Sequence, residues 1–134
     1  ICLPDHGGRY PRNLNINDPK FFYSPMLWLG GAVNEPEKVN LLMNQSDMAA
    51  TLLGQLDVDH DDFLFSRDIF SDTYTYPFTF FSFNNGFGFA DSTGVSVYDN
   101  NANVPISEVP AHSKPRLDRA KAILQTLYDD LDAR

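Results

Sequence analysis

The Phe-rich segment between residues 77 and 98 limits the possible folds of this chain more than any other feature. It contains three apolar runs separated by turn sequences, and the runs are residues 78–83, 87–90 and 95–98. The first separator is Asn84-Asn85-Gly86, and Asn-Gly tolerates the positive φ of a tight hairpin. The second is Asp91-Ser92-Thr93-Gly94, which is ordinary turn chemistry. The segment therefore predicts three strands of an antiparallel meander that packs one face on a helix.

Two other segments have the spacing of amphipathic helices. Ser46 or Asp47 is a candidate N-cap for the first, while the second has Ser113 as a candidate cap and Pro115 in its first turn. The apolar stripes are Met48, Leu52, Leu53 and Leu56 in the first segment and Leu117, Ala120, Leu124, Leu127 and Leu131 in the second. We therefore expect one helix near residues 48–56 and a terminal helix from residue 115.

The first part of the chain has short apolar runs between polar stretches. Residues 1–3 and 21–23 are typical of buried strands, and residues 9–20 are typical of a surface loop. Periodicity does not distinguish a helical turn from a strand for residues 26–29. A buried strand at the start of the chain predicts that its sheet partners lie upstream, in the mostly parallel sheet of a larger α/β protein.

Size and charge restrict the domain count and the possible partners. The 134 residues include eleven Phe and six Tyr, which is sufficient for one domain with one core. The formal net charge of −8 and the lack of a Lys/Arg cluster predict that nucleic acid is not a partner. The single Cys2 excludes an internal disulfide framework. No apolar run approaches the roughly 20 residues of a membrane-spanning helix.

Asp5-His6-Gly7 is the one constellation with a chemical mechanism behind it. A carboxylate oxygen and an imidazole nitrogen are both ligands of divalent metals, and here they are adjacent. Neighbouring side chains of a strand point to opposite faces, so both can reach one ion only where the strand has given way to a turn. Gly7 and Gly8 permit that turn. The simpler interpretation is a capped loop that binds no metal.

Three segments carry a resemblance to a known family. They are Asp5-His6-Gly7, residues 21–25 (Phe-Phe-Tyr-Ser-Pro) and residues 45–54 (Gln-Ser-Asp-Met-Ala-Ala-Thr-Leu-Leu-Gly). In their order and spacing, the chain resembles the lipoteichoic-acid-synthase-like phosphoglycerol transferases and related sulfatases of the alkaline phosphatase superfamily. Ala50 departs from the Pro that this family often has at that position, which concerns entry into the helix rather than chemistry.

The resemblance implies an α/β fold, the C-terminal part of an alkaline-phosphatase-like fold. Parallel strands with helices would be followed by a small antiparallel meander and a terminal helix. Residues 1–134 would then form a single C-terminal segment of a catalytic domain whose nucleophile, remaining metal ligands and anion-binding residues lie upstream. The segment alone would be inactive, and the absent nucleophile leaves phosphoglycerol transfer and sulfate-ester hydrolysis undistinguished.

The resemblance also implies the metal, the substrate class and the location. Asp5 and His6 would hold one divalent ion, which is Mn²⁺, Mg²⁺ or Zn²⁺. The substrate would be an anionic phosphate or sulfate ester, and the segment would work with the remainder of its own catalytic domain. The resembled synthases are anchored in the membrane, which implies a location on the extracytoplasmic face of the cell membrane.

Four other residues have a functional and a simpler interpretation. Arg9 is a weak candidate for binding a substrate anion, or an exposed loop arginine. His60 and His112 are candidate ligands of a second metal, or solvated histidines. Cys2 begins a sequence like the Cys-x-Pro-x-Arg signature of sulfatases, but His6 stands where Arg is required. We therefore expect Cys2 to be a small buried hydrophobe.

A non-catalytic accessory module is the competing class of function. In that interpretation, Asp5-His6 is a structural loop, and the Phe-rich meander or the final helix binds a partner. The phenylalanines concerned are Phe78, Phe80, Phe81, Phe83, Phe87 and Phe89.

Overall fold

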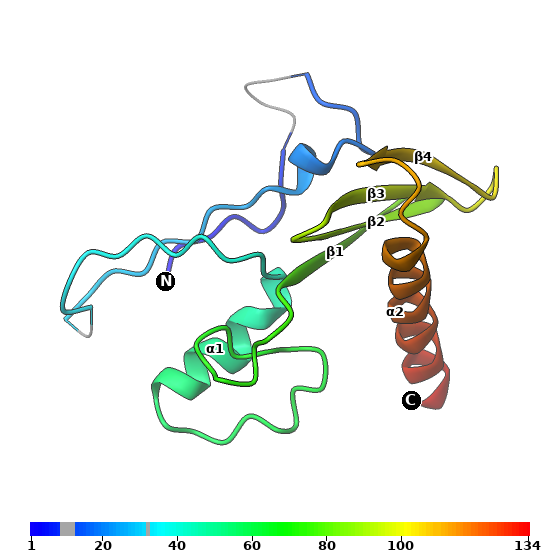
Figure 1. Ribbon diagram of the computed structural model, residues 1–134. Coiled ribbons are helices and arrows are strands. Elements are labelled where there is room, and N and C mark those ends of the chain that lie inside the picture. The colour runs from blue at the N-terminus through cyan, green and yellow to red at the C-terminus, as the bar shows by residue number, and fades with distance from the viewer. Residues whose placement is uncertain (9–12, 32) are drawn as a thin grey trace.

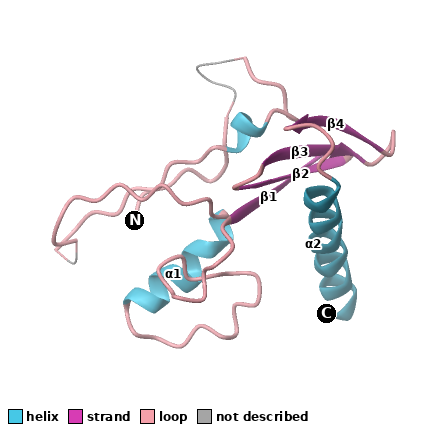
Figure 2. Cartoon of the chain, viewed as in Figure 1, coloured by secondary structure: helices cyan, strands magenta, loops and turns pink. Residues whose placement is uncertain are grey.

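Helices and strands follow one another along the chain in the computed structural model, which describes residues 1–8, 13–31 and 33–134. The helices are the short 3₁₀-helices η1 (Pro19–Phe22) and η2 (Gln45–Asp47) and the α-helices α1 (Met48–Gln55) and α2 (Lys114–Ala133). Figure 1 shows α2 against the sheet and α1 below the start of β1. The described segment before α1 is mostly loop (Figure 2). The mixture of helices and strands agrees with the predicted α/β class.

The sheet confirms the predicted meander and extends it by one strand. Its antiparallel strands lie in the order β1-β2-β3-β4, and they are β1 (Phe78–Phe83), β2 (Gly86–Asp91), β3 (Gly94–Asp99) and β4 (Val104–Val109). Asn85 in the first turn has φ 66°, and Gly94 directly after the second has φ 135°. Asn and Gly adopt such values at low cost, which explains why these two turns could be predicted from the sequence.

The sequence does not predict β4. Pro105 argues against a central strand because it cannot donate to a ladder, and β4 is an edge strand, where proline is tolerated. Most residues of β4 are exposed, so its sequence lacks the alternation of a half-buried strand. The register with β3 also shifts between Val97 and Tyr98.

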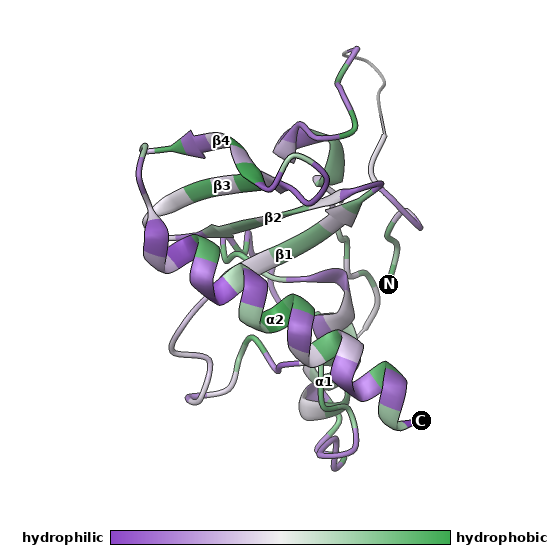
Figure 3. Ribbon diagram, turned by 90° about the vertical axis from the view of Figure 1, so that its right-hand side faces the viewer, coloured by the Kyte–Doolittle hydropathy of each residue, from purple (hydrophilic) through white to green (hydrophobic). Residues whose placement is uncertain are grey.

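Helix α2 covers one face of the sheet, as Figure 3 shows. The core on this face contains Phe87, Phe89, Tyr98 and, from the helix, Ala120. Partly buried residues complete the layer, and these are Phe78, Phe80, Leu117, Ile123 and Leu124. The predicted helix and most of its stripe are therefore confirmed, whereas Leu131 is exposed near the C-terminal end. No helix in the described ranges is both long and apolar enough to span a bilayer.

Part of the N-terminal half covers the opposite face of the sheet. Phe81 of β1 stacks on Phe22 of η1, with ring centroids 4.3 Å apart and planes at 25°. The Phe81 ring lies over Gly88 of β2, where a Cβ atom would be 2.0 Å from the ring. Val97 of β3 is fully buried on this face. The predicted packing of one face on a helix is therefore confirmed by α2, and the phenylalanines pack on the opposite face as well, which was not predicted.

A buried polar cluster joins the start of α1 to the sheet, and we call it the Asp47 cluster (Asn44, Asp47 and Arg67). The Asp47 carboxylate is fully buried and accepts hydrogen bonds from the Arg67 guanidinium at 2.6 and 3.1 Å. Arg67 also donates to the Phe78 carbonyl, and the Asn44 side chain accepts from the Phe80 amide at 2.7 Å. The Asp47 cluster thereby fixes both the start of α1 and strand β1.

The helix near residues 48–56 is confirmed, but its capping is not. Asp47 occupies the N-cap position of α1, yet its side chain makes no capping hydrogen bond to that helix. Its carboxylate is engaged instead by Arg67 and by the Asn44 backbone amide. Ser46 lies within η2, so it does not cap α1. The ion pair with Arg67 outweighs the local cap because it satisfies a fully buried charge.

The two buried strands expected in the first part of the chain are wrong. Cys2 forms only an isolated antiparallel bridge with Leu27, and residues 21 and 22 belong to η1. The Asp18 side chain accepts from the Lys20 amide and Pro19 opens the turn, which favours a helical turn over a strand. Every strand pair among the described residues is antiparallel, so the predicted parallel strands are absent there.

A second buried polar cluster lies between the sheet and α2. Arg116 is 1% exposed and donates to Ser96, to Thr93 and to the Pro110 carbonyl at 2.8–3.1 Å. Burial alone would raise the pKa of Asp91, but hydrogen bonds from Thr93 and Tyr76 and the charge of Arg116 hold it below its usual value. Asp91 therefore stabilises the fold as a carboxylate.

Truncation of the core phenylalanine Phe89 to alanine should destabilise the protein by about 3–5 kcal/mol. Its side chain is fully buried between α2 and the sheet, so the change leaves a cavity that neighbouring strands cannot close. Chemical denaturation measures the loss. Tyr128→Ala on the exposed side of α2 is the matched control and should stay within about 0.5 kcal/mol; equal effects of the two substitutions would contradict the described core.

The lowered pKa of Asp91 predicts acid sensitivity. The stabilisation is complete above the carboxyl's unfolded pKa near 3.8 and is lost as the pH falls through the lower folded pKa. Free energies of unfolding measured from pH 6 down to pH 2 should therefore fall less steeply in the acid range for Asp91→Asn than for the unchanged protein. Asp118→Asn on the exposed face of α2 should keep the original slope. Parallel acid profiles for Asp91→Asn and the unchanged protein would refute the assignment.

Candidate functional site

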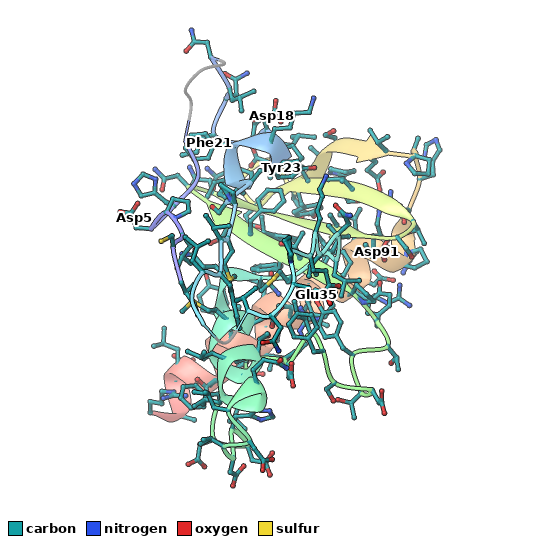
Figure 4. All side chains as sticks on the ribbon, turned by 90° about the vertical axis from the view of Figure 1, so that its left-hand side faces the viewer. Asp5, Asp18, Phe21, Tyr23, Glu35 and Asp91 are labelled. Carbon is teal, nitrogen blue, oxygen red and sulfur yellow. The ribbon has the colours of Figure 1, made fainter. Side chains whose placement is uncertain are left out.

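Asp5 and His6 lie in an exposed loop directly after the Cys2–Leu27 bridge. Figure 4 shows Asp5 at the edge of the molecule, on the side away from Asp91. The bridge consists of two backbone hydrogen bonds of 2.8 Å each. The side chains of Asp5 and His6 are 88% and 79% exposed. Both groups are therefore accessible to an ion from solvent.

The two side chains point toward each other. His6 Nε2 lies 3.6 Å from Asp5 Oδ2. The other carboxylate oxygen, Oδ1, accepts a hydrogen bond from the His6 backbone amide at 3.0 Å, which orients the carboxylate toward the imidazole. The turn after Pro4 thus brings the two side chains together, whereas a continued strand would place them on opposite faces.

The hydrogen bond at His6 Nδ1 determines which ring nitrogen is free. Nδ1 lies 2.6 Å from the Gly7 carbonyl oxygen, which only accepts, so Nδ1 carries the proton. In the neutral ring, Nε2 then presents its lone pair toward Asp5. Two acceptors facing each other at this distance favour a proton or a cation between them. A backbone carbonyl on the second ring nitrogen is also the usual support of a metal-ligating histidine.

The spacing of Nε2 and Oδ2 fits a shared divalent ion. With metal–ligand bonds of about 2.1 Å, a separation of 3.6 Å corresponds to a ligand–metal–ligand angle of about 120°, near tetrahedral geometry. Across the residues that the structure describes, no group of three or more His, Cys, Asp or Glu side chains is arranged to hold a metal. The pair can therefore supply two ligands, and a complete coordination shell needs others.

Contacts from two segments distant in sequence support the loop of residues 4–7, which carries Asp5 and His6 and which we call the ligand loop. Gly7 is buried against the backbone of η1, where a Cβ atom would lie 1.7 Å from the Phe21 carbonyl oxygen. The Gln45 side chain donates to the Pro4 carbonyl at 2.9 Å. Residues 21–25 and residues 45–54, two of the segments that carry the family resemblance, thus each contact the Asp5-His6 turn.

The remaining predicted site residues do not join this pair. Arg9 lies outside the described residues. His60 and His112 form no group of three potential ligands with Asp5 and His6 in the described ranges. Cys2 is exposed, so the expectation of a buried hydrophobe is wrong; the single bridge to Leu27 leaves its side chain uncovered.

Gln45 was not assigned a role by the sequence patterns, although it belongs to one of the matched segments. Its bond to Pro4 spans 41 residues, and no local pattern reports such a contact. The only sequence signal was its place at the start of residues 45–54.

Comparison of the chain with protein-family models, with curated proteins and with solved structures finds no match.

The two glycines after His6 should differ in their tolerance of a side chain. A Cβ atom at Gly7 collides with the η1 backbone, whereas one at Gly8 meets nothing within 4 Å. Gly7→Ala should therefore destabilise the protein by about 1–3 kcal/mol, and Gly8→Ala should change little. Thermal unfolding of the two variants gives the comparison. Equal stability would show that the loop does not pack on η1.

Proposed function

We propose that this chain is the C-terminal part of a metal-dependent phosphoryl- or sulfuryl-transfer enzyme, a phosphoglycerol transferase or sulfatase-like hydrolase with an alkaline-phosphatase-like fold. Asp5 and His6 supply two ligands of its divalent ion. The observation that carries the proposal is the pair itself: Nε2 and Oδ2 are 3.6 Å apart, and the second ring nitrogen is held by a carbonyl.

The charge of the chain supports a cation at this site. A net charge of −8 repels an anionic phosphate or sulfate ester, and a bound cation would offset that repulsion at the site. Mn²⁺, Mg²⁺ or Zn²⁺ would lower the pKa of a nucleophile and stabilise the charge on the transferred group. Asp5 and His6 hold the ion and attack nothing, so the chain without the remainder of its catalytic domain is inactive.

The exposed apolar residues near the site support a contact with the remainder of the catalytic domain. Ile1, Tyr23, Leu27 and Leu29 are all exposed, although they belong to the segments around the Cys2–Leu27 bridge. Another part of the domain that contributes the missing ligands would also cover this surface. The location that goes with the proposal is the extracytoplasmic face of the cell membrane.

The competing accessory-module interpretation has less support. The form of it in which the Phe-rich meander binds a partner requires an accessible sheet surface, yet Phe87 and Phe89 are buried against α2 and Phe81 stacks on η1. These phenylalanines are occupied by contacts within the chain. The interpretation would have to rely on other exposed residues.

Substitution of either proposed ligand should remove the metal. In the full-length protein, stripped by a chelator and dialysed against Mn²⁺ or Zn²⁺, Asp5→Ala and His6→Ala should each lower the affinity by at least about tenfold, because the ion loses a direct ligand. Elemental analysis after dialysis measures the bound ion.

The chain offers a matched control in a second Asp-His dipeptide. Asp59 and His60 lie in the loop after α1, and Asp59→Ala and His60→Ala should leave the metal content unchanged. Metal content that is the same in the Asp5 and His6 variants as in the unchanged protein would exclude the proposed site.

A further inference from the structure

We infer that Gln45 is a positioning residue for the metal ligands Asp5 and His6. This inference rests on the proposed function, since it concerns the same ion. It assigns to an uncharged side chain, 40 residues from the ligands in sequence, the task of holding their loop in the geometry that binds metal.

Few contacts of their own fix the positions of the Asp5 and His6 side chains. Both are largely exposed, and their hydrogen bonds are local, to the His6 amide and the Gly7 carbonyl. Their geometry therefore depends on how the backbone of residues 4–7 is held. That backbone is fixed before the turn by the Cys2–Leu27 bridge and after it by the contact of Gly7 with Phe21.

Gln45 acts between these two points. Its Nε2 donates to the Pro4 carbonyl at 2.9 Å and lies 3.5 Å from the Asp5 carbonyl oxygen. No other side chain from outside the loop is seen to hydrogen-bond to residues 4–6 in the part of the chain that the structure describes. A hydrogen bond to the peptide group next to Asp5 limits the rotation that would turn the carboxylate away from His6.

The base of the Gln45 side chain is itself fixed to the sheet. Gln45 begins η2, and its neighbours Asn44 and Asp47 belong to the Asp47 cluster. Asn44 bonds to the Phe80 amide of β1, and the buried Asp47 binds Arg67. These contacts fix η2 relative to the sheet, and η2 carries the Gln45 side chain that bonds to the exposed Asp5-His6 loop.

The group that Gln45 directs at the Asp5-His6 loop is a hydrogen-bond donor and not a metal ligand. Its amide nitrogen, which has no free lone pair for a metal, is turned toward the two carbonyl oxygens. Loss of the donor should weaken metal binding while Asp5 and His6 remain present. Methionine is the most informative replacement, because it has a similar length, is uncharged and donates no hydrogen bond.

The test compares Gln45→Met with Gln55→Met in the full-length protein. Gln55 is an exposed residue at the other end of α1, and its replacement is the same chemical change. We expect Gln45→Met to lower Zn²⁺ affinity by about tenfold and to alter the visible absorption of the Co²⁺-substituted site, which reports ligand geometry. The melting temperature of the metal-free protein should match that of Gln55→Met.

The outcomes separate this inference from the proposed function. If Asp5→Ala and His6→Ala abolish metal binding but Gln45→Met equals Gln55→Met in affinity and spectrum, the positioning role is refuted and the metal site stands. If Gln45→Met lowers affinity only in proportion to a lowered melting temperature, with an unchanged Co²⁺ spectrum, the role is merely structural and the inference is overturned. If Asp5→Ala and His6→Ala bind metal normally, both proposals are overturned.

Discussion

The ion pair between Asp47 and Arg67 is the interaction on which the arrangement of this chain depends. Asp47 is fully buried, and a buried carboxylate without a partner would be strongly destabilising, by about 3–5 kcal/mol when one member of such a pair is removed. The Arg67 guanidinium covers two aromatic rings as well, at 3.8 Å from the centre of Phe78 and 4.9 Å from that of Tyr74. One arginine thus joins helix α1, the loop before the sheet and strand β1.

The proposed metal site has the opposite character, since its ligands are exposed and are supported by backbone contacts. The division has a physical basis: a charged cluster that is buried and fully hydrogen-bonded has one arrangement, whereas the geometry of an exposed pair depends on the backbone that carries it and on a bound ion. Under the proposed function, Asp5 and His6 would form one side of a site on this open surface, and another part of the protein would complete it. The fold of the described residues and the proposed chemistry are therefore connected through few contacts, of which Gln45 makes one.

Features with a local cause could be predicted from the sequence, and features with a distant cause could not. The turns at Asn85 and Gly94 and most of the apolar stripe of α2 are local, and they were predicted correctly. The pairing of Asp47 with Arg67 spans 20 residues, and the contact of Gln45 with Pro4 spans 41. In the candidate site, the adjacency of Asp5 and His6 is visible in the sequence, but the proton on Nδ1 depends on the Gly7 carbonyl and could not be read from it.

The coverage of both faces of the sheet has a consequence for strand alignment. In β1 and β2, apolar side chains lie on both sides, so shifting one strand by a residue would still bury hydrophobic groups, and alternation alone cannot select the pairing. Instead, two aromatic rings face glycines across the strands, Phe81 opposite Gly88 and Phe83 opposite Gly86. A one-residue slip would bring Phe81 opposite Phe87 or Phe89 and would remove the glycine over which its ring lies. The empty positions of the glycines, more than the hydrophobic residues around them, encode which amide pairs with which carbonyl.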